Sequence, residues 1–223
     1  MRNLEKEKKT SNYDLQVDIA KKIFMEYDQE LLIHKFHLLA DETWIYIKYL
    51  NTPYRINRKD GRVEEDLQGS GFSECRSYDT VMTIYDLLCY SKGETMPILF
   101  QKWHTINSLS IGQSPDAGRF TKSYAKFFQK YRKELKTACE SLGGVIQKPM
   151  ARADLTCLIP VTSFFPVMLQ FWEEDEEYAP QLMILWDENY SSFLHFETTF
   201  YLQGDLLERL KNILERQKKR GDL

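Results

Sequence analysis

The chain has 223 residues and a formal net charge of −3 at pH 7, and 43% of its residues are hydrophobic. That length is enough for one sizeable core, and the composition excludes the disordered class. The weak net charge argues against a general nucleic-acid binder, because no strong positive field would attract phosphates. An aromatic share of 13% predicts large side chains packed between helices and sheet.

Signals for a membrane or an extracellular location are not found in the sequence. Residues 1–9 are mostly charged with no apolar signal segment after them, and no window approaches the roughly 18 apolar residues of a membrane helix. The four cysteines stand far apart, which argues against disulfides and against a cysteine-built metal site. They are Cys75, Cys89, Cys139 and Cys157. We expect a cytoplasmic protein with no membrane or nucleic-acid partner and no evident cofactor.

A helix opens the predicted fold, after a disordered arm at residues 1–11. Ser11 and Asn12 can cap this helix. Apolar residues then recur every four positions, which places them on one buried stripe. The stripe consists of Leu15, Ile19, Ile23 and Tyr27.

Antiparallel strands are predicted next. Residues 32–39 and 43–50 are β-prone runs. Asp60-Gly61 predicts a tight turn between two further runs, because Asp-Gly accepts the positive φ of such turns. The first third of the chain therefore predicts a helix followed by a meander.

The middle of the chain predicts two helices separated by a loop. Ser77 caps the first helix, which ends near Gly93. Residues 97–116 are rich in Ser, Gly and Pro and predict a loop. Helical spacing of apolar residues continues from there to the stop at Gly143-Gly144.

The last third predicts short strands and a final amphipathic helix. The strand runs cover residues 145–148, 155–159, 166–172 and 182–186. The helix frays into a tail at 218–223. Together these elements predict an α+β fold, with a mostly antiparallel sheet and about four helices packed on it. A single domain would span residues 12–217, because no repeat or linker interrupts them.

Five consecutive acids at residues 173–177 are the most unusual segment. If the strand continued, Glu173, Asp175 and Glu177 would share one face, because side chains alternate along a strand. Packed carboxylates repel one another, so a divalent cation such as Mg²⁺ or Ca²⁺, or a cationic partner, would stabilise them. An exposed acidic loop explains the same run without a ligand. Both interpretations stay open.

Further candidates lie just beyond this run. Asp187 follows a strand, and Glu197 stands near the start of the last helix, whose dipole favours an ionised acid. Helix capping would explain Glu197 equally well. His195 is a candidate acid–base residue. The candidate ligand-binding residues are Trp172, Asp175, Glu177, Asp187, His195 and Glu197.

Familiar catalytic and metal-binding motifs are not present. His34 and His37 would chelate a metal on a helix, but on the expected strand their rings face opposite ways. No phosphate-binding GxxxxGK[ST] loop and no HExxH motif occurs.

The C-terminal third carries a distinctive pattern of aromatic and acidic residues. It reads Trp172-x-x-Asp175-Glu176-Glu177-Tyr178-x-Pro180, then Leu185-Trp186-Asp187, then Glu197. This pattern resembles a bacterial family catalogued as a domain of unknown function, with a W-x-x-D-E-E-[FY]-P segment followed by L-F-D. The chain departs from it mildly at Ala179 and Trp186.

The resemblance extends from about Asn12 to Leu214. It implies a stand-alone cytoplasmic protein typical of anaerobic bacteria. Some relatives are fused to iron–sulfur domains similar to those of corrinoid proteins. This chain lacks the cysteine cluster of such a domain, so the resemblance implies at most a companion role.

Three functions are consistent with these observations. The favoured one is an accessory protein whose acidic site binds a small ligand, a cation or a partner protein. The second is a metal-assisted, hydrolase-like enzyme, in which His195 is the base and four carboxylates lie within about 5–6 Å of a common point. Those carboxylates are Asp175, Glu177, Asp187 and Glu197. The third is a structural homo-oligomer, in which exposed Phe164 and Phe165 form a homodimer patch.

Overall fold

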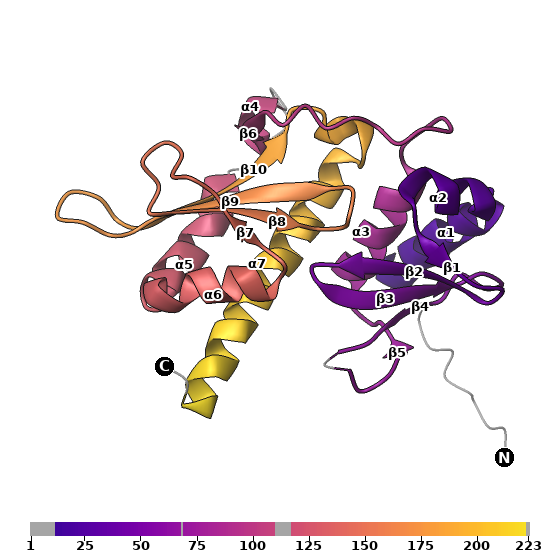
Figure 1. Ribbon diagram of the computed structural model, residues 1–223, viewed down its shortest axis with the longest axis horizontal. Coiled ribbons are helices and arrows are strands. Elements are labelled where there is room, and N and C mark those ends of the chain that lie inside the picture. The colour runs from indigo at the N-terminus through magenta and orange to yellow at the C-terminus, as the bar shows by residue number, and fades with distance from the viewer. Residues whose placement is uncertain (1–11, 68, 110–116, 222–223) are drawn as a thin grey trace, which may run out of the picture.

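The computed structural model describes residues 12–67, 69–109 and 117–221 (Figure 1). These residues form an α+β fold, as predicted, but with two five-stranded antiparallel sheets in place of one. Seven α-helices occur in the described ranges, in place of about four. The predicted arm at residues 1–11 lies outside the described part of the chain.

The N-terminal sheet is a meander with strand order β1-β2-β3-β4-β5, accompanied by three helices. The elements are α1 (Asn12–Glu26), α2 (Gln29–Phe36), β1 (Leu39–Ala40), β2 (Trp44–Tyr49), β3 (Thr52–Asn57), β4 (Val63–Glu65), β5 (Ser73–Glu74) and α3 (Tyr78–Cys89). The predicted Asp-Gly turn joins β3 to β4 and is confirmed, since Gly61 adopts φ 72°.

The strand predicted at residues 32–39 is wrong, because most of this segment is helix α2. Asp28 caps the helix by accepting a hydrogen bond from the Leu31 N–H group at 3.1 Å. Leu32 and Phe36, one turn apart, are both buried against the core. The rings of His34 and His37 therefore do not face opposite ways, and their centroids lie 6.4 Å apart.

The C-terminal sheet has the strand order β6-β10-β9-β8-β7. Its elements are β6 (Trp103–Thr105), α4 (Ile106–Leu109), α5 (Ala117–Gln129), α6 (Arg132–Ser141), β7 (Val145–Ile146), β8 (Leu155–Pro160), β9 (Pro166–Trp172), β10 (Gln181–Asp187), the 3-10 turn η1 (Tyr190–Ser192) and α7 (Phe196–Arg220). The four predicted strands of this region are confirmed.

Three predictions in this half need correction. The loop expected at 97–116 contains β6 and α4 within its described residues. The single helix expected before Gly143-Gly144 is divided into α5 and α6 by a break at Lys130-Tyr131. Helix α7 continues past residue 217 to Arg220, where Gly221 caps it in the left-handed region at φ 76°.

Helix α7 holds the two halves together. It packs against α3 as well as against α5 and α6 (Figure 1). Its fully buried side chains are Leu202, Leu206, Leu207, Leu210 and Leu214. Full burial of one such side chain contributes about 1.5–3 kcal/mol to folding. Buried residues from both sheets belong to one hydrophobic cluster; the single-domain boundaries 12–217 stay a prediction.

A partly buried arginine, Arg209, forms polar contacts between α7 and the N-terminal sheet. The Arg209 guanidinium pairs with Asp205 on its own helix at 2.8 Å. It also donates to the Tyr54 hydroxyl at 2.7 Å and to the Thr52 hydroxyl at 3.1 Å, both on β3. These three partners of the charge therefore come from both halves of the molecule.

The aromatic patch predicted at the tip of the β8–β9 hairpin is not on the surface. Phe165 is fully buried and Phe164 is 5% exposed. Phe164 stacks on Phe36 of α2 with ring centroids 4.4 Å apart, and Phe165 packs beside Phe193 at 5.2 Å. The prediction is wrong because the hairpin tip is inserted between the two halves of the fold.

Helices long and apolar enough to cross a bilayer do not occur among the described residues.

Candidate functional site

The predicted acidic segment is an exposed turn whose own backbone uses its carboxylates. Asp175 Oδ1 accepts hydrogen bonds from the N–H groups of Glu177 at 2.9 Å and Tyr178 at 2.7 Å. Glu173 forms an ion pair with Arg132 at 3.1 Å, and Trp172 Nε1 donates to the Ala151 carbonyl at 3.1 Å. These contacts favour the interpretation of a solvated loop between β9 and β10.

Asp187 lies elsewhere and is fully buried at the end of β10. Its carboxylate accepts three backbone hydrogen bonds, from Phe100 at 3.0 Å, Gln101 at 2.6 Å and Asn189 at 2.9 Å. These donors occupy the carboxylate and hold the segment that leads into β6 against β10. Asp187 therefore has a structural environment and does not face the acidic turn.

The metal-ligand set of four carboxylates is wrong. No group of three or more His, Cys, Asp or Glu side chains that could hold a metal ion occurs in the described ranges, which include all four carboxylates. The six predicted site residues divide among three places. Trp172, Asp175 and Glu177 belong to the acidic turn, and Asp187 lies beneath residues 100–101. His195 and Glu197 alone share a cavity.

That cavity is a groove of about 320 Å³ between α1, α3 and the first turns of α7, called the three-helix groove below. Its walls are largely apolar and aromatic. The tyrosines that line it are Tyr78, Tyr85, Tyr90 and Tyr201. Two of them, Tyr78 of α3 and Tyr201 of α7, meet edge to face with ring centroids 5.4 Å apart.

Helix α1 forms the outer wall of the groove with side chains that were predicted to be buried. Leu15 is 50% exposed, Ile19 57% and Ile23 45%, so three members of the predicted stripe are only partly covered. Phe24 is the fully buried residue of α1. The apolar face of α1 is wider than the surface that α3 can cover, and its remainder opens onto the groove.

A histidine–aspartate pair marks the polar end of the groove. His195 Nδ1 lies 2.6 Å from Asp86 Oδ1, and the His195 backbone N–H donates to Asp86 Oδ2 at 2.8 Å. The Tyr90 ring packs against the imidazole with centroids 4.0 Å apart. The carboxylate accepts the Nδ1 proton, so in the neutral imidazole Nε2 carries a free lone pair.

Exposure within this pair is unequal. The Asp86 side chain is 13% exposed and that of His195 is 59% exposed. Nε2 makes no hydrogen bond to another described residue, whereas both oxygens of Asp86 are used by His195. Asp86 therefore orients the ring, and the imidazole presents Nε2 to whatever enters the groove.

Three lining side chains, Cys89, Tyr78 and Tyr85, have raised pKa values. Burial raises the pKa of the Cys89 thiol to about 12, mainly because an anion there would be desolvated. Burial also raises the pKa values of Tyr78 and Tyr85 well above their ordinary range. A protonated thiol is a poor nucleophile, and the side-chain partner of His195 is Asp86, both of which argue against a Cys–His catalytic pair.

Comparison with known families gives one match. The family described as Domain of unknown function (DUF3786) matches residues 30–209. The chain belongs to this family. The resemblance inferred from the acidic pattern is thereby confirmed. No curated protein and no solved structure matches the chain.

The DUF3786 match includes most of the groove. It contains α3 with Asp86 and the C-cap Tyr90, and the start of α7 with the N-cap His195 and with Glu197. Helix α1 lies before the matched region. The histidine–aspartate pair is thus part of the family domain, and the α1 wall is outside the matched residues.

Asp86 and Tyr90 were not predicted as site residues. A signal for Asp86 was present, because an acid near the C-terminus of a helix is disfavoured by the helix dipole. The last turn of α3 contains no basic residue that would compensate for it. Such an acid is expected to have a partner outside its own helix, and here that partner is His195.

Proposed function

We propose that this DUF3786 protein is a binding protein for a small aromatic ligand, neutral or cationic, which occupies the three-helix groove. His195 Nε2 would accept a hydrogen bond from the ligand. The observation that carries the proposal is the partly buried Asp86 that orients an exposed His195 at the end of an aromatic groove. The proposal keeps the favoured ligand-binding function and moves it from the acidic turn to the groove.

The size and lining of the groove define the ligand. A cavity of about 320 Å³ lies at the lower end of the roughly 300–1,000 Å³ of ligand pockets, which fits a molecule of one or two rings. Tyrosine faces and edges favour aromatic rings over aliphatic chains. Glu197 is exposed in the first turn of α7 and lines the groove, so it would disfavour an anion and favour an amine.

Binding is better supported than catalysis. His195 and Asp86 resemble the base and orienting acid of many enzymes, but the groove offers no activated nucleophile, since the Cys89 thiol is protonated. The described residues hold no cluster of metal ligands there.

The test is a binding titration followed by NMR amide shifts. Tryptamine is the probe, indole removes the amine, and hexylamine removes the ring. We expect tryptamine to shift amides around Tyr78, Tyr90 and Tyr201, with indole weaker and hexylamine inactive. His195→Gln should weaken tryptamine binding about tenfold, because the loss of one hydrogen bond worth about 1.4 kcal/mol raises the dissociation constant by that factor.

A matched control is available outside the groove. The His104 side chain is half exposed and lies outside the groove. Its Nε2 atom is 3.4 Å from the carboxylate of Glu188, in the turn that follows β10. His104→Gln should leave the titration unchanged. Shifts that are scattered over the surface, or equal affinities of wild type and His195→Gln, would refute the proposal.

A cytoplasmic location is also part of this proposal. It is supported by the four cysteines, which are all free thiols in the structure. A homodimer, the bacterial origin and the association with iron–sulfur proteins stay predictions.

A further inference from the structure

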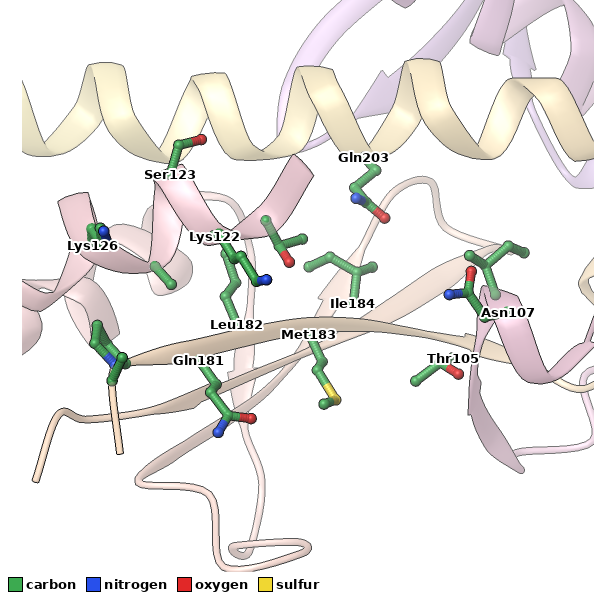
Figure 2. A pocket seen from close by; sticks show the side chains of 15 residues that line it. Thr105, Asn107, Lys122, Ser123, Lys126, Gln181, Leu182, Met183, Ile184 and Gln203 are labelled. Atoms are coloured by element: carbon green, nitrogen blue, oxygen red, sulfur yellow. The ribbon is translucent and has the colours of Figure 1, made fainter. Parts of the chain in front are cut away.

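A second and larger cavity lies at the edge of the C-terminal sheet. It has a volume of about 780 Å³ and is bounded by β10, α4, α5 and α7 (Figure 2). This space, called the β10 cavity below, shares no lining residue with the three-helix groove. Leu182 and Ile184 of β10 and Ala125 of α5 give it an apolar, buried floor.

The buried polar side chains among the lining residues are Thr121 of α5 and Gln203 of α7. Gln203 of α7 is 5% exposed and points from the helix into the β10 cavity (Figure 2). Its neighbours Leu202, Leu206 and Leu207 are fully buried in the core. The Gln203 amide makes no hydrogen bond to any other residue that the structure describes.

The Gln203 amide is open to this cavity. Its N and O atoms are not among the fully buried, unpaired side-chain atoms of the described residues, although the residue as a whole is 5% exposed. A polar group that enters the cavity can form a hydrogen bond with this amide, which has both a donor and an acceptor. The amide therefore points to an occupant with a hydrogen-bonding group.

The charges around the β10 cavity are all of one sign. Lys122 and Lys126 of α5 line it one helical turn apart, and both side chains are exposed. No aspartate or glutamate is among its lining residues. Within the described ranges neither lysine forms an ion pair, and like charges at this spacing repel. An anion between them would relieve that repulsion.

Figure 2 shows the lysines toward one end of β10 and Gln203, with Asn107, toward the other. We propose that the β10 cavity is a second ligand site, which binds an elongated organic anion. Its anionic head lies between Lys122 and Lys126, its apolar body rests on Leu182 and Ile184, and a second polar group bonds to the Gln203 amide. A volume of about 780 Å³ accommodates such a molecule, because ligand pockets span roughly 300–1,000 Å³.

The experiment measures binding of four matched probes by calorimetry. The probes are 10-hydroxydecanoate, decanoate, methyl 10-hydroxydecanoate and decyl phosphate. We expect 10-hydroxydecanoate to bind more tightly than decanoate, which lacks the distal hydroxyl group. The neutral methyl ester should bind at least tenfold more weakly. Tighter binding of decyl phosphate would support the anion site and identify a phosphate as the preferred head.

Variants separate the two ends of the β10 cavity. Both lysines are exposed, so the double variant Lys122→Gln, Lys126→Gln should fold normally and weaken every anionic probe at least tenfold. Adding salt should weaken the wild type in the same way. Gln203→Leu should abolish the preference for 10-hydroxydecanoate over decanoate and leave decanoate binding intact.

The control is Lys130→Gln, a charge change of the same kind at an exposed residue outside the cavity lining. It should not alter affinity. The inference is overturned if no anionic probe binds, if the methyl ester binds as tightly as the acid, or if the double lysine variant behaves like Lys130→Gln. None of these results depends on ligands of the three-helix groove.

Discussion

Replacement of Asp187 by asparagine should destabilise the protein strongly. The carboxylate is fully buried and accepts hydrogen bonds from Phe100, Gln101 and Asn189 at 2.6–3.0 Å. Asparagine keeps the shape of the side chain but has one acceptor oxygen in place of two. In Asp187→Asn the oxygen can retain the bonds that Oδ1 accepts from Phe100 and Asn189, and the new NH₂ group then faces the Gln101 N–H.

The magnitude follows from these three bonds. Loss of the bond to Gln101 costs about 1.5–3 kcal/mol, the net value of a hydrogen bond to a charged group. The two remaining bonds change from charged to neutral acceptors and weaken by about 1 kcal/mol each. The sum is a loss of about 3–5 kcal/mol, a large share of the roughly 5–15 kcal/mol that stabilises a folded domain.

Urea unfolding followed by tryptophan fluorescence measures this loss directly. The control is Glu176→Gln in the exposed acidic turn, which should change the free energy of unfolding by less than about 0.5 kcal/mol. If Asp187→Asn unfolds within 1 kcal/mol of the wild type, the structural role of Asp187 is refuted. If it becomes more stable, the carboxylate is a functional group that costs stability, as the sequence-based site prediction implies.

Phe165→Ala should lower the free energy of unfolding by about 3–5 kcal/mol in the same urea assay, because the ring is fully buried between the two halves; a loss below 1 kcal/mol would contradict its position. Arg209→Met should cost about 2–4 kcal/mol, since it leaves the partly buried Asp205 carboxylate without its ion-pair partner. A double-mutant cycle with Asp205→Asn should show a coupling of at least about 1 kcal/mol, and additivity would argue against the pair. Burial raises the pKa of the Cys75 and Cys89 thiols from 9.0 to about 12. The unfolded chain therefore loses these protons first, so their contribution to stability is complete below pH 9.0 and is lost as the pH rises toward about 12. Cys89→Ala should reduce the slope of stability against pH between these values by up to about 1.4 kcal/mol per unit, and an unchanged slope would contradict the burial of this thiol.

The strands of the C-terminal sheet could be predicted because each is an apolar run bounded by turn residues. β8, β9 and β10 agree with the runs at 155–159, 166–172 and 182–186 to within one residue at most ends. Helix α2 was missed because eight residues rich in Leu, Ile and Phe show a weak period. Its cap, Asp28, was the stronger signal.

Division of the fold into two sheets could not be predicted from local patterns. Strand runs indicate that sheets exist, but they do not specify which strands pair. The same limit applies to Phe164 and Phe165, because a hairpin tip is exposed unless another part of the chain covers it. Here α2 supplies that cover through Phe36.

Some residues of the candidate site could be predicted from the sequence, but which residues share one cavity could not. His195 and Glu197 were selected for their chemistry, and they share the three-helix groove. Asp86 precedes His195 by 109 residues, so no local pattern could pair them. The periodicity of α1 showed which face is apolar, but it could not show that α3 leaves part of that face uncovered.

The position of α7 in the chain has a consequence for biosynthesis. Translation delivers both sheets and α1–α6 before residues 196–220 emerge, yet these late residues supply a wall of each cavity and five of the fully buried leucines. Until they dock, the nascent protein exposes the apolar surfaces of α3 and α5 to solvent, a state that is prone to aggregation. The demand for chaperones should therefore be greatest before α7 docks.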